Sequence, residues 1–163
     1  MKESRPQIEL KILDPRLHVW GLPDYQTAMS AGVDMYACID TPIVIMPQAP
    51  AVLIPSGIAL LMNDPHMVGF LLARSGLGHK QGLVLSQAVG TIDADYTAQI
   101  YMSMWLRNPP GSEAVTVSPG DRIAQLVFLP ILRPSFSVVD EFSQSTERGE
   151  GGFGSTGLTA SAI

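Results

Sequence analysis

The sequence predicts an all-β protein with one compact domain, built as a β-sandwich or a β-barrel. Apolar residues occur in short runs, several of which alternate with polar residues, and the runs recur about every 8–12 positions. The 15 glycines and 13 prolines are scattered along the 163 residues, which disfavours long helices. A chain of this length has room for about one domain of average size.

Strands are expected in the following order along the chain: residues 8–13, 43–46, 51–62, 67–73, 98–106, 114–117, 123–129 and 136–139. The first reads I-E-L-K-I-L and ends at Asp14-Pro15, where a strand would stop. The segment 98–106 places alternate apolar side chains on one face, namely Ile100, Met102, Met104 and Leu106. Residues 78–87 are the one segment that could hold a short helix, although two glycines disfavour it.

The chain changes character from about residue 143, where it becomes polar and rich in glycine. Four glycines fall within residues 149–154, so this stretch cannot pack by itself and should be mobile until a ligand orders it. We therefore expect a β core over residues 1–142 and a flexible C-terminal arm over residues 143–163.

Composition limits the function. Hydrophobic residues make up 46% and charged residues 15%, which disfavours disorder and predicts a large core or a subunit interface. The net charge of −5 disfavours binding to nucleic acid or anionic membranes.

Cys38 is the single cysteine, so an internal disulfide is excluded and we expect a buried thiol in a reducing compartment. No apolar run approaches the length of a membrane span, and we expect a cytoplasmic protein.

Two clusters in the first half of the chain place polar groups where a plain β-protein would have apolar ones. A-G-V-D-M-Y-A puts Asp34 in an apolar strand, where a carboxylate is costly unless it is paired, satisfies a turn or faces a ligand. A-R-S-G-L-G-H-K offers a guanidinium, a hydroxyl and an open backbone N–H at Arg74, Ser75 and Gly76, which suits phosphate oxygens or a plain strand-end turn. His79 and Lys80 are expected to form a solvated face.

Three further clusters follow. G-T-I-D-A-D-Y carries Asp93 and Asp95, which could supply a general base or a metal site, or could simply form a hairpin turn. In G-D-R-I-A-Q-L, Arg122 and Gln125 are three positions apart and are expected on opposite faces, one pairing with Asp121 and the other facing a ligand. The last cluster, R-G-E-G-G-F-G-S-T-G, is a glycine-rich segment with one Arg and one Phe, and it is either a linker or a phosphate-binding loop.

In this order the five clusters resemble the five motifs of the trimeric deoxyuridine triphosphatases (dUTPases), most closely the bacterial and phage members. The resemblance implies a distorted jelly-roll β-barrel. It also implies a homotrimer with three active sites at subunit boundaries. Each site would take motifs one, two and four from one subunit, motif three from a second and motif five from a third.

The implied reaction is hydrolysis of dUTP to dUMP and pyrophosphate, which limits uracil in DNA and supplies dUMP for thymidylate synthesis. By resemblance, Asp93 is the general base for the attacking water. The phosphates would be bound by Arg74, Ser75, Gly76, Gln125, Arg148, Ser155 and Thr156. The base and sugar would be bound by Gln87, Gly90, Thr91, Ile92, Tyr96 and Phe153.

A metal ion is also expected. A triphosphate carries about four negative charges, which two or three local arginines on an acidic chain do not neutralise. Mg²⁺ suits oxygen ligands and retained waters. In the family the phosphates hold the ion, and Asp34 would reach it through water.

The sequence departs from the usual family pattern at Ala73, where a proline is common, and at Gln87, where many bacterial members have asparagine. Residues 158–163 are assigned no role. A dCTP deaminase, or a bifunctional enzyme of the same fold, is one alternative, but that chemistry needs an additional acid/base carboxylate. The deaminase family usually presents a glutamate shortly after the hairpin aspartate, whereas the residues after Tyr96 are T-A-Q-I, with Gln99 and no glutamate. A regulatory binding protein, switched by nucleotide, is the other.

Overall fold

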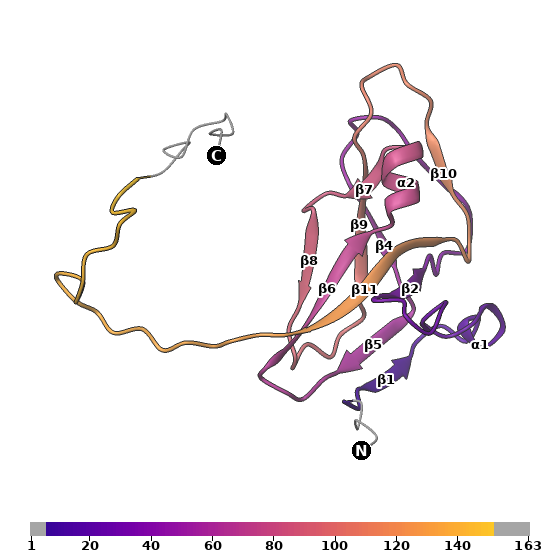
Figure 1. Ribbon diagram of the computed structural model, residues 1–163. Coiled ribbons are helices and arrows are strands. Elements are labelled where there is room, and N and C mark those ends of the chain that lie inside the picture. Colours follow the sequence, from indigo (N-terminus) through magenta and orange to yellow (C-terminus); the bar gives the residue numbers. More distant parts are fainter. Residues whose placement is uncertain (1–5, 152–163) are drawn as a thin grey trace. The chain divides into compact units, whose positions relative to one another are not determined.

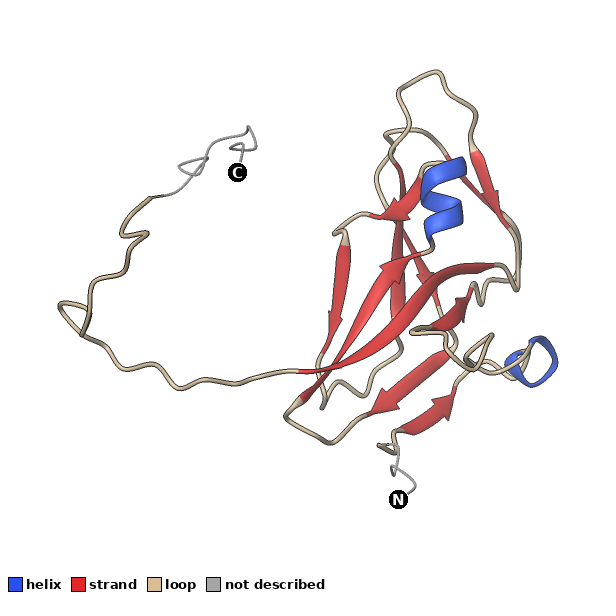
Figure 2. Ribbon diagram, viewed as in Figure 1, coloured by secondary structure: helices blue, strands red, loops and turns tan. Residues whose placement is uncertain are grey.

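The structure is a computed structural model that describes residues 6–151. The chain divides into two units between Arg133 and Pro134. All helices and strands of the described residues belong to the first unit (Figure 1). The strands are β1 (Glu9–Ile12), β2 (Val33–Tyr36), β3 (Ile43–Ile45), β4 (Val52–Pro55), β5 (Ile58–Leu61), β6 (Met67–Ala73), β7 (Leu83–Leu85), β8 (Val89–Ile92), β9 (Tyr101–Leu106), β10 (Val115–Val117) and β11 (Arg122–Pro130). The helices are α1 (Leu17–Trp20) and α2 (Ser75–Lys80), and both are short (Figure 2).

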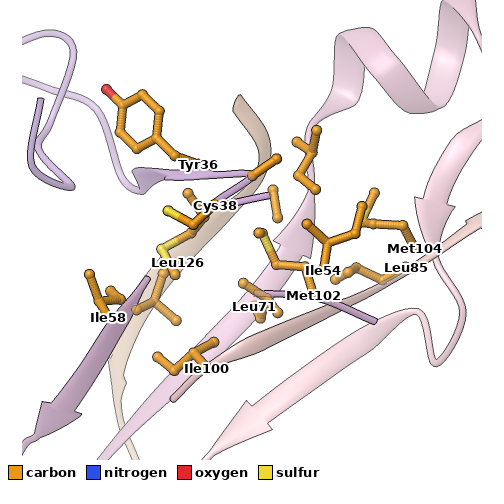
Figure 3. Packing of buried hydrophobic residues seen from close by; sticks show 14 of the residues in the cluster. Tyr36, Cys38, Ile54, Ile58, Leu71, Leu85, Ile100, Met102, Met104 and Leu126 are labelled. Carbon is orange, nitrogen blue, oxygen red and sulfur yellow. The ribbon is translucent and has the colours of Figure 1, made fainter. Parts of the chain in front are cut away.

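The strands form four antiparallel sheets. The largest has the order β2-β11-β6-β8, the next has the order β4-β9-β7, and β1-β5 and β3-β10 are two-stranded. One hydrophobic cluster joins the two larger sheets, with Leu71 and Leu126 from the first and Ile54 and Met102 from the second (Figure 3). The predicted all-β class is confirmed.

Alternation of apolar residues located most strands correctly. The apolar face predicted for residues 98–106 is confirmed, since Ile100, Met102, Met104 and Leu106 are all at most 1% exposed. The strand itself begins only at Tyr101. The predicted strand over residues 51–62 is divided into β4 and β5, because Gly57 turns the chain with a φ of 71°.

Two predictions about elements are wrong. Residues 136–139 form no strand, and Phe136 and Val138 are 93% and 98% exposed, because an isolated segment finds no ladder partner within the described chain. The short helix lies at Ser75–Lys80, three residues earlier than expected. It stops before Gly82, whose φ of 77° cannot continue a helix, and the sequence then enters β7.

The second unit, described over residues 134–151, has neither helix nor strand in that range. A tight turn occurs where Gly149 donates its backbone N–H to the Thr146 carbonyl oxygen at 3.1 Å. The unit begins nine residues before the arm boundary expected at residue 143. No helix within residues 6–151 is long and apolar enough to cross a membrane.

Candidate active site

Most of the predicted site residues line two separate pockets of the first unit. The first, the arginine pocket, has a volume of about 480 Å³ and is lined by Asp34, Arg74, Ser75, Gly76 and Gln125. Strand β11 lies between β2 and β6 and explains this grouping. Its Ala124 and Gln125 pair with Met35 and Asp34 on one side and with Ala73 and Leu72 on the other. Motifs far apart in sequence therefore become neighbours across three strands.

Asp34 is the charged centre of this pocket and is 7% exposed. Its Oδ1 lies 3.2 Å from Arg74 Nε, and its Oδ2 lies 2.9 Å from Arg122 Nη1. Arg74 Nη1 also donates to the Arg122 carbonyl oxygen at 2.9 Å. The carboxylate is thus paired on both oxygens, which removes the cost of burying it alone.

The expectation that Arg122 and Gln125 face opposite sides is wrong. The ladder between β11 and β2 shifts register between Arg122 and Ala124. A bulge of this kind changes the direction in which the Arg122 side chain points. Arg122 therefore reaches Asp34, while Gln125 also lines the arginine pocket and donates from Nε2 to the Ala73 carbonyl oxygen at 3.2 Å. Asp121 does not pair with Arg122, and instead accepts the Ser118 backbone N–H at 2.7 Å.

The second pocket, the hairpin pocket, has a volume of about 310 Å³. It is lined by all of the described residues predicted to serve as base, sugar or water partners, namely Gln87, Gly90, Thr91, Ile92, Asp93 and Tyr96. A Cβ at Gly90 would lie 3.1 Å from Leu71 Cβ and 3.3 Å from Gln87 Nε2, so a larger residue here would require its neighbours to shift by a few tenths of an ångström. The Tyr96 backbone N–H donates to the Asp93 carbonyl oxygen at 3.1 Å, so the hairpin turn is present as well.

Asp93 and Arg74 lie toward opposite ends of β6. Asp93 follows Ile92, which pairs with Gly69 near the start of β6, whereas Arg74 follows the last residue of that strand. Five residues of extended strand separate Gly69 from Arg74, a distance of roughly 17 Å. Asp93 and Arg74 of one chain therefore do not reach the same reacting atom.

Several residues that line these pockets were not assigned to the site from the sequence, among them Lys80, Gln26 and Tyr101. Lys80 and Gln26 line the arginine pocket, and Gln26 Oε1 accepts from Arg122 Nη1 at 3.1 Å. Tyr101 lines the hairpin pocket, and its Oη accepts from Gln99 Nε2 at 2.9 Å. Lys80 was expected on a solvated face. Placing it in the pocket required knowing that α2 begins at Ser75, because Gly76 and Lys80 then share a helix face.

The predicted residues of the arm belong to the second unit or lie outside the described residues. Arg148 belongs to the second unit, where its Nε donates to the Gly151 carbonyl oxygen at 2.9 Å. Phe153, Ser155 and Thr156 lie outside the described residues. Within residues 6–151, no group of three or more His, Cys, Asp or Glu side chains is arranged to hold a metal ion.

The fold and the two pockets define an all-β protein with one pocket that presents the cationic side chains of Arg74 and Lys80, which suit an anion, and a second pocket formed by a close-packed hairpin. The family model described as dUTPase matches residues 19–157, and the chain belongs to the dUTPase family. It is 51% identical over 152 residues to the deoxyuridine 5'-triphosphate nucleotidohydrolase of Tolumonas auensis, covering 93% of this chain and 97% of that one. The Legionella pneumophila (strain Paris) protein of the same name is 52% identical over 151 residues, covering 92% of this chain and 96% of that one.

Solved structures agree with these sequence matches. The dUTPase of Staphylococcus bacteriophage 80alpha, as a G164S mutant with dUpNHpp, is similar with a TM-score of 0.78 at 27% identity. The match covers 94% of this chain and all of the phage chain. The resemblance inferred from the five motifs is confirmed, and with it the distorted jelly-roll β-barrel.

Proposed function

We propose that the protein hydrolyses dUTP to dUMP and pyrophosphate by attack of water at the α-phosphorus. The observation that carries this proposal is that the chain is about half identical to deoxyuridine triphosphate nucleotidohydrolases over almost its whole length. The two pockets supply the chemistry that such a substrate needs. One presents cations and hydroxyls, and the other is a narrow hairpin that carries a carboxylate.

The arginine pocket binds the phosphate chain in this proposal. Arg74, Ser75 and Gln125 donate hydrogen bonds that stabilise the charge building on the leaving pyrophosphate. At Gly76 a Cβ would meet no atom within 4 Å, so the pocket is open at this residue, and its backbone N–H is proposed to bind a phosphate oxygen. Arg148, Ser155 and Thr156 of the arm clasp the γ-phosphate.

The hairpin pocket binds the nucleoside. Backbone groups of Gly90, Thr91 and Ile92 read the uracil edge, beside Gln87, and cytosine is rejected because its amino group leaves buried polar groups unpaired. Tyr96 packs on the deoxyribose and excludes a 2′-hydroxyl, and Phe153 covers the base. Asp93, at the end of the hairpin strand, accepts a proton from the attacking water.

The geometry of β6 supports a site shared between subunits of a homotrimer. Gly69, the β6 residue that pairs with Ile92 next to Asp93, lies roughly 17 Å along the strand from Arg74, so an Asp93 that takes a proton from water attacking a phosphorus held by Arg74 must come from another chain. The exposed Phe136 and Val138 of the second unit also need burial, which a neighbouring subunit provides.

Mg²⁺ is proposed as the cofactor. Asp34 is the one carboxylate lining the arginine pocket among the described residues, and both of its oxygens are paired with arginines. It does not bind an ion alone, which fits an ion held by substrate phosphates with Asp34 contacting it through water on its remaining lone pairs. When bound, the ion neutralises phosphate charge.

A dCTP deaminase is not favoured. Gln99 carries no carboxylate, and its Nε2 donates to Tyr101 Oη, which ties this side chain to the pocket wall. Nothing in the described residues favours a regulatory role over catalysis. We also propose a cytoplasmic location, which suits an enzyme with one cysteine, buried as a free thiol.

The test is turnover of dUTP, dCTP, UTP and dTTP, each with Mg²⁺ and with EDTA, with pyrophosphate and ammonia measured in the same samples. Pyrophosphate from dUTP alone, lost in EDTA, is the expected result. Ammonia from dCTP would move the protein to the deaminases, and no product from any nucleotide would contradict catalysis.

A further inference from the structure

Lys80 occupies a place in the arginine pocket that the proposed roles leave unexplained. It is the last residue of α2 and lines the pocket together with Arg74, Ser75 and Gly76. Because Gly76 and Lys80 are four residues apart in the helix, their side-chain positions lie on one face. The spacing also sets Lys80 about 6 Å further along the helix axis than Gly76.

The charge balance of the pocket shows why this lysine matters. Arg74 and Arg122 share one carboxylate, Asp34, at 3.2 and 2.9 Å, so together they contribute about one net positive charge. Lys80 forms no ion pair with any carboxylate among residues 6–151. Its ammonium therefore adds a full charge to a pocket that must receive about four negative ones.

We propose that Lys80 is a phosphate-binding residue that contacts the distal phosphates of the substrate. This inference rests on the proposed function, since it assumes that a nucleoside triphosphate enters the pocket. Ser75 and Gly76 are proposed to hold the phosphates nearest the sugar, and Lys80 lies about 6 Å beyond Gly76 along the axis of α2, so a phosphate further from the sugar is the one that we assign to Lys80. A flexible ammonium acts there as a point charge without fixed geometry.

The contribution of Lys80 to binding should therefore depend on how many phosphates the ligand carries. Lys80 stabilises a bound triphosphate but contributes little to a monophosphate, which ends before reaching it. Because the side chain is exposed, the interaction is screened by salt and its size is modest.

Four proteins are compared: the wild type, Lys80→Gln, Lys80→Arg and Lys11→Gln. Lys11 is an exposed lysine on β1 that lines neither pocket, so Lys11→Gln removes the same charge from the chain without touching the site. Binding of dUpNHpp and of dUMP is measured by calorimetry with Mg²⁺, and KM for dUTP is measured at low and high salt.

We expect Lys80→Gln to weaken dUpNHpp binding by about 3- to 10-fold and to leave dUMP binding within about 2-fold. KM should rise more than kcat falls, with a shallower salt dependence, while Lys80→Arg and Lys11→Gln resemble the wild type. Equal weakening of dUMP and dUpNHpp, or no weakening of either, would overturn the role of Lys80. If the wild type itself neither binds nor hydrolyses dUTP, the proposed function fails instead.

Discussion

Single residues set the electrostatics of the site, and Asp34 is the clearest example. A carboxylate in an apolar strand predicts a partner, and this much could be inferred from the sequence. The identity of the partners could not, because Arg122 reaches Asp34 only through the register shift after it in β11, which no sequence pattern marks. The position of Lys80 in the pocket lining could not be predicted for a similar reason, because the helix face on which Lys80 lies depends on where the six-residue helix α2 begins.

Replacement of Asp34 should destabilise the fold. Asp34→Asn leaves two guanidinium groups without their counter-charge, and because these are 34% and 40% exposed, the expected loss in free energy of unfolding is about 1–3 kcal/mol. Asp40→Asn is the control, because Asp40 also pairs with an arginine but is 93% exposed and should contribute little. Denaturant unfolding measures both, and equal effects would contradict the account.

Asp93 should act in the chemical step alone. Asp93→Asn keeps the shape of the hairpin but cannot accept a proton, so kcat should fall by about 10²- to 10⁴-fold. Affinity for dUpNHpp, measured by calorimetry, should stay nearly unchanged. A variant that lost binding to the same extent as turnover would show that Asp93 holds substrate and is not the base.

Cys38 gives the fold a pH dependence. Burial raises the pKa of its thiol from 9.0 to about 12, and its Sγ donates to the Ser56 carbonyl oxygen at 3.2 Å. The folded state keeps this proton after the unfolded state has lost it. The contribution of the Cys38 thiol to the free energy of unfolding is therefore fully present below pH 9 and is lost progressively as pH rises toward 12. Unfolding free energies between pH 8 and 11 should fall more steeply for the wild type than for Cys38→Ser, and parallel curves would contradict the assignment.

At the scale of elements, alternation of apolar residues was the informative signal. Together with short apolar runs bounded by proline, it placed β1, β3, β6, β10 and β11 and the buried face of β9, but β7 and β8 were not predicted. It failed for α1, which has four residues, and for residues 136–139, whose apolar pattern has no partner in the chain described. The pattern of apolar residues predicts which face of a segment is apolar, but it does not predict which other segment covers that face.

Removal of residues 148–163 should separate folding from catalysis. Every described helix and strand and the whole core cluster precede residue 134, so the truncated protein should unfold at nearly the same denaturant concentration as the full chain. Turnover of dUTP should fall severely, because Arg148 and the residues after it are proposed to close on the γ-phosphate. Unchanged turnover would remove this segment from the mechanism.

At the scale of the whole molecule, Asp93 and Arg74, which are proposed to act on one substrate, lie toward opposite ends of β6 within a chain. The sequence motifs contain most of the residues assigned to the two pockets, although Gln26, Lys80 and Tyr101 were not assigned. The separation of Asp93 from Arg74 became evident only from the pairing register along β6. The chain's net charge of −5 has the opposite sign to the arginine pocket, so the site attracts phosphate through local charge alone.

The most direct test of this account is the activity of mixed assemblies formed by co-refolding equal amounts of Asp93→Asn and Arg74→Ala chains, each of which should be inactive by itself. If every site takes Arg74 from one chain and Asp93 from another, random assembly leaves one site in four intact and restores about a quarter of wild-type activity. A wild type mixed with the double variant is the control, and it should also show about a quarter under the shared arrangement. No recovery in the first mixture, together with about half activity in the control, would show that each chain forms its own site and would contradict the account.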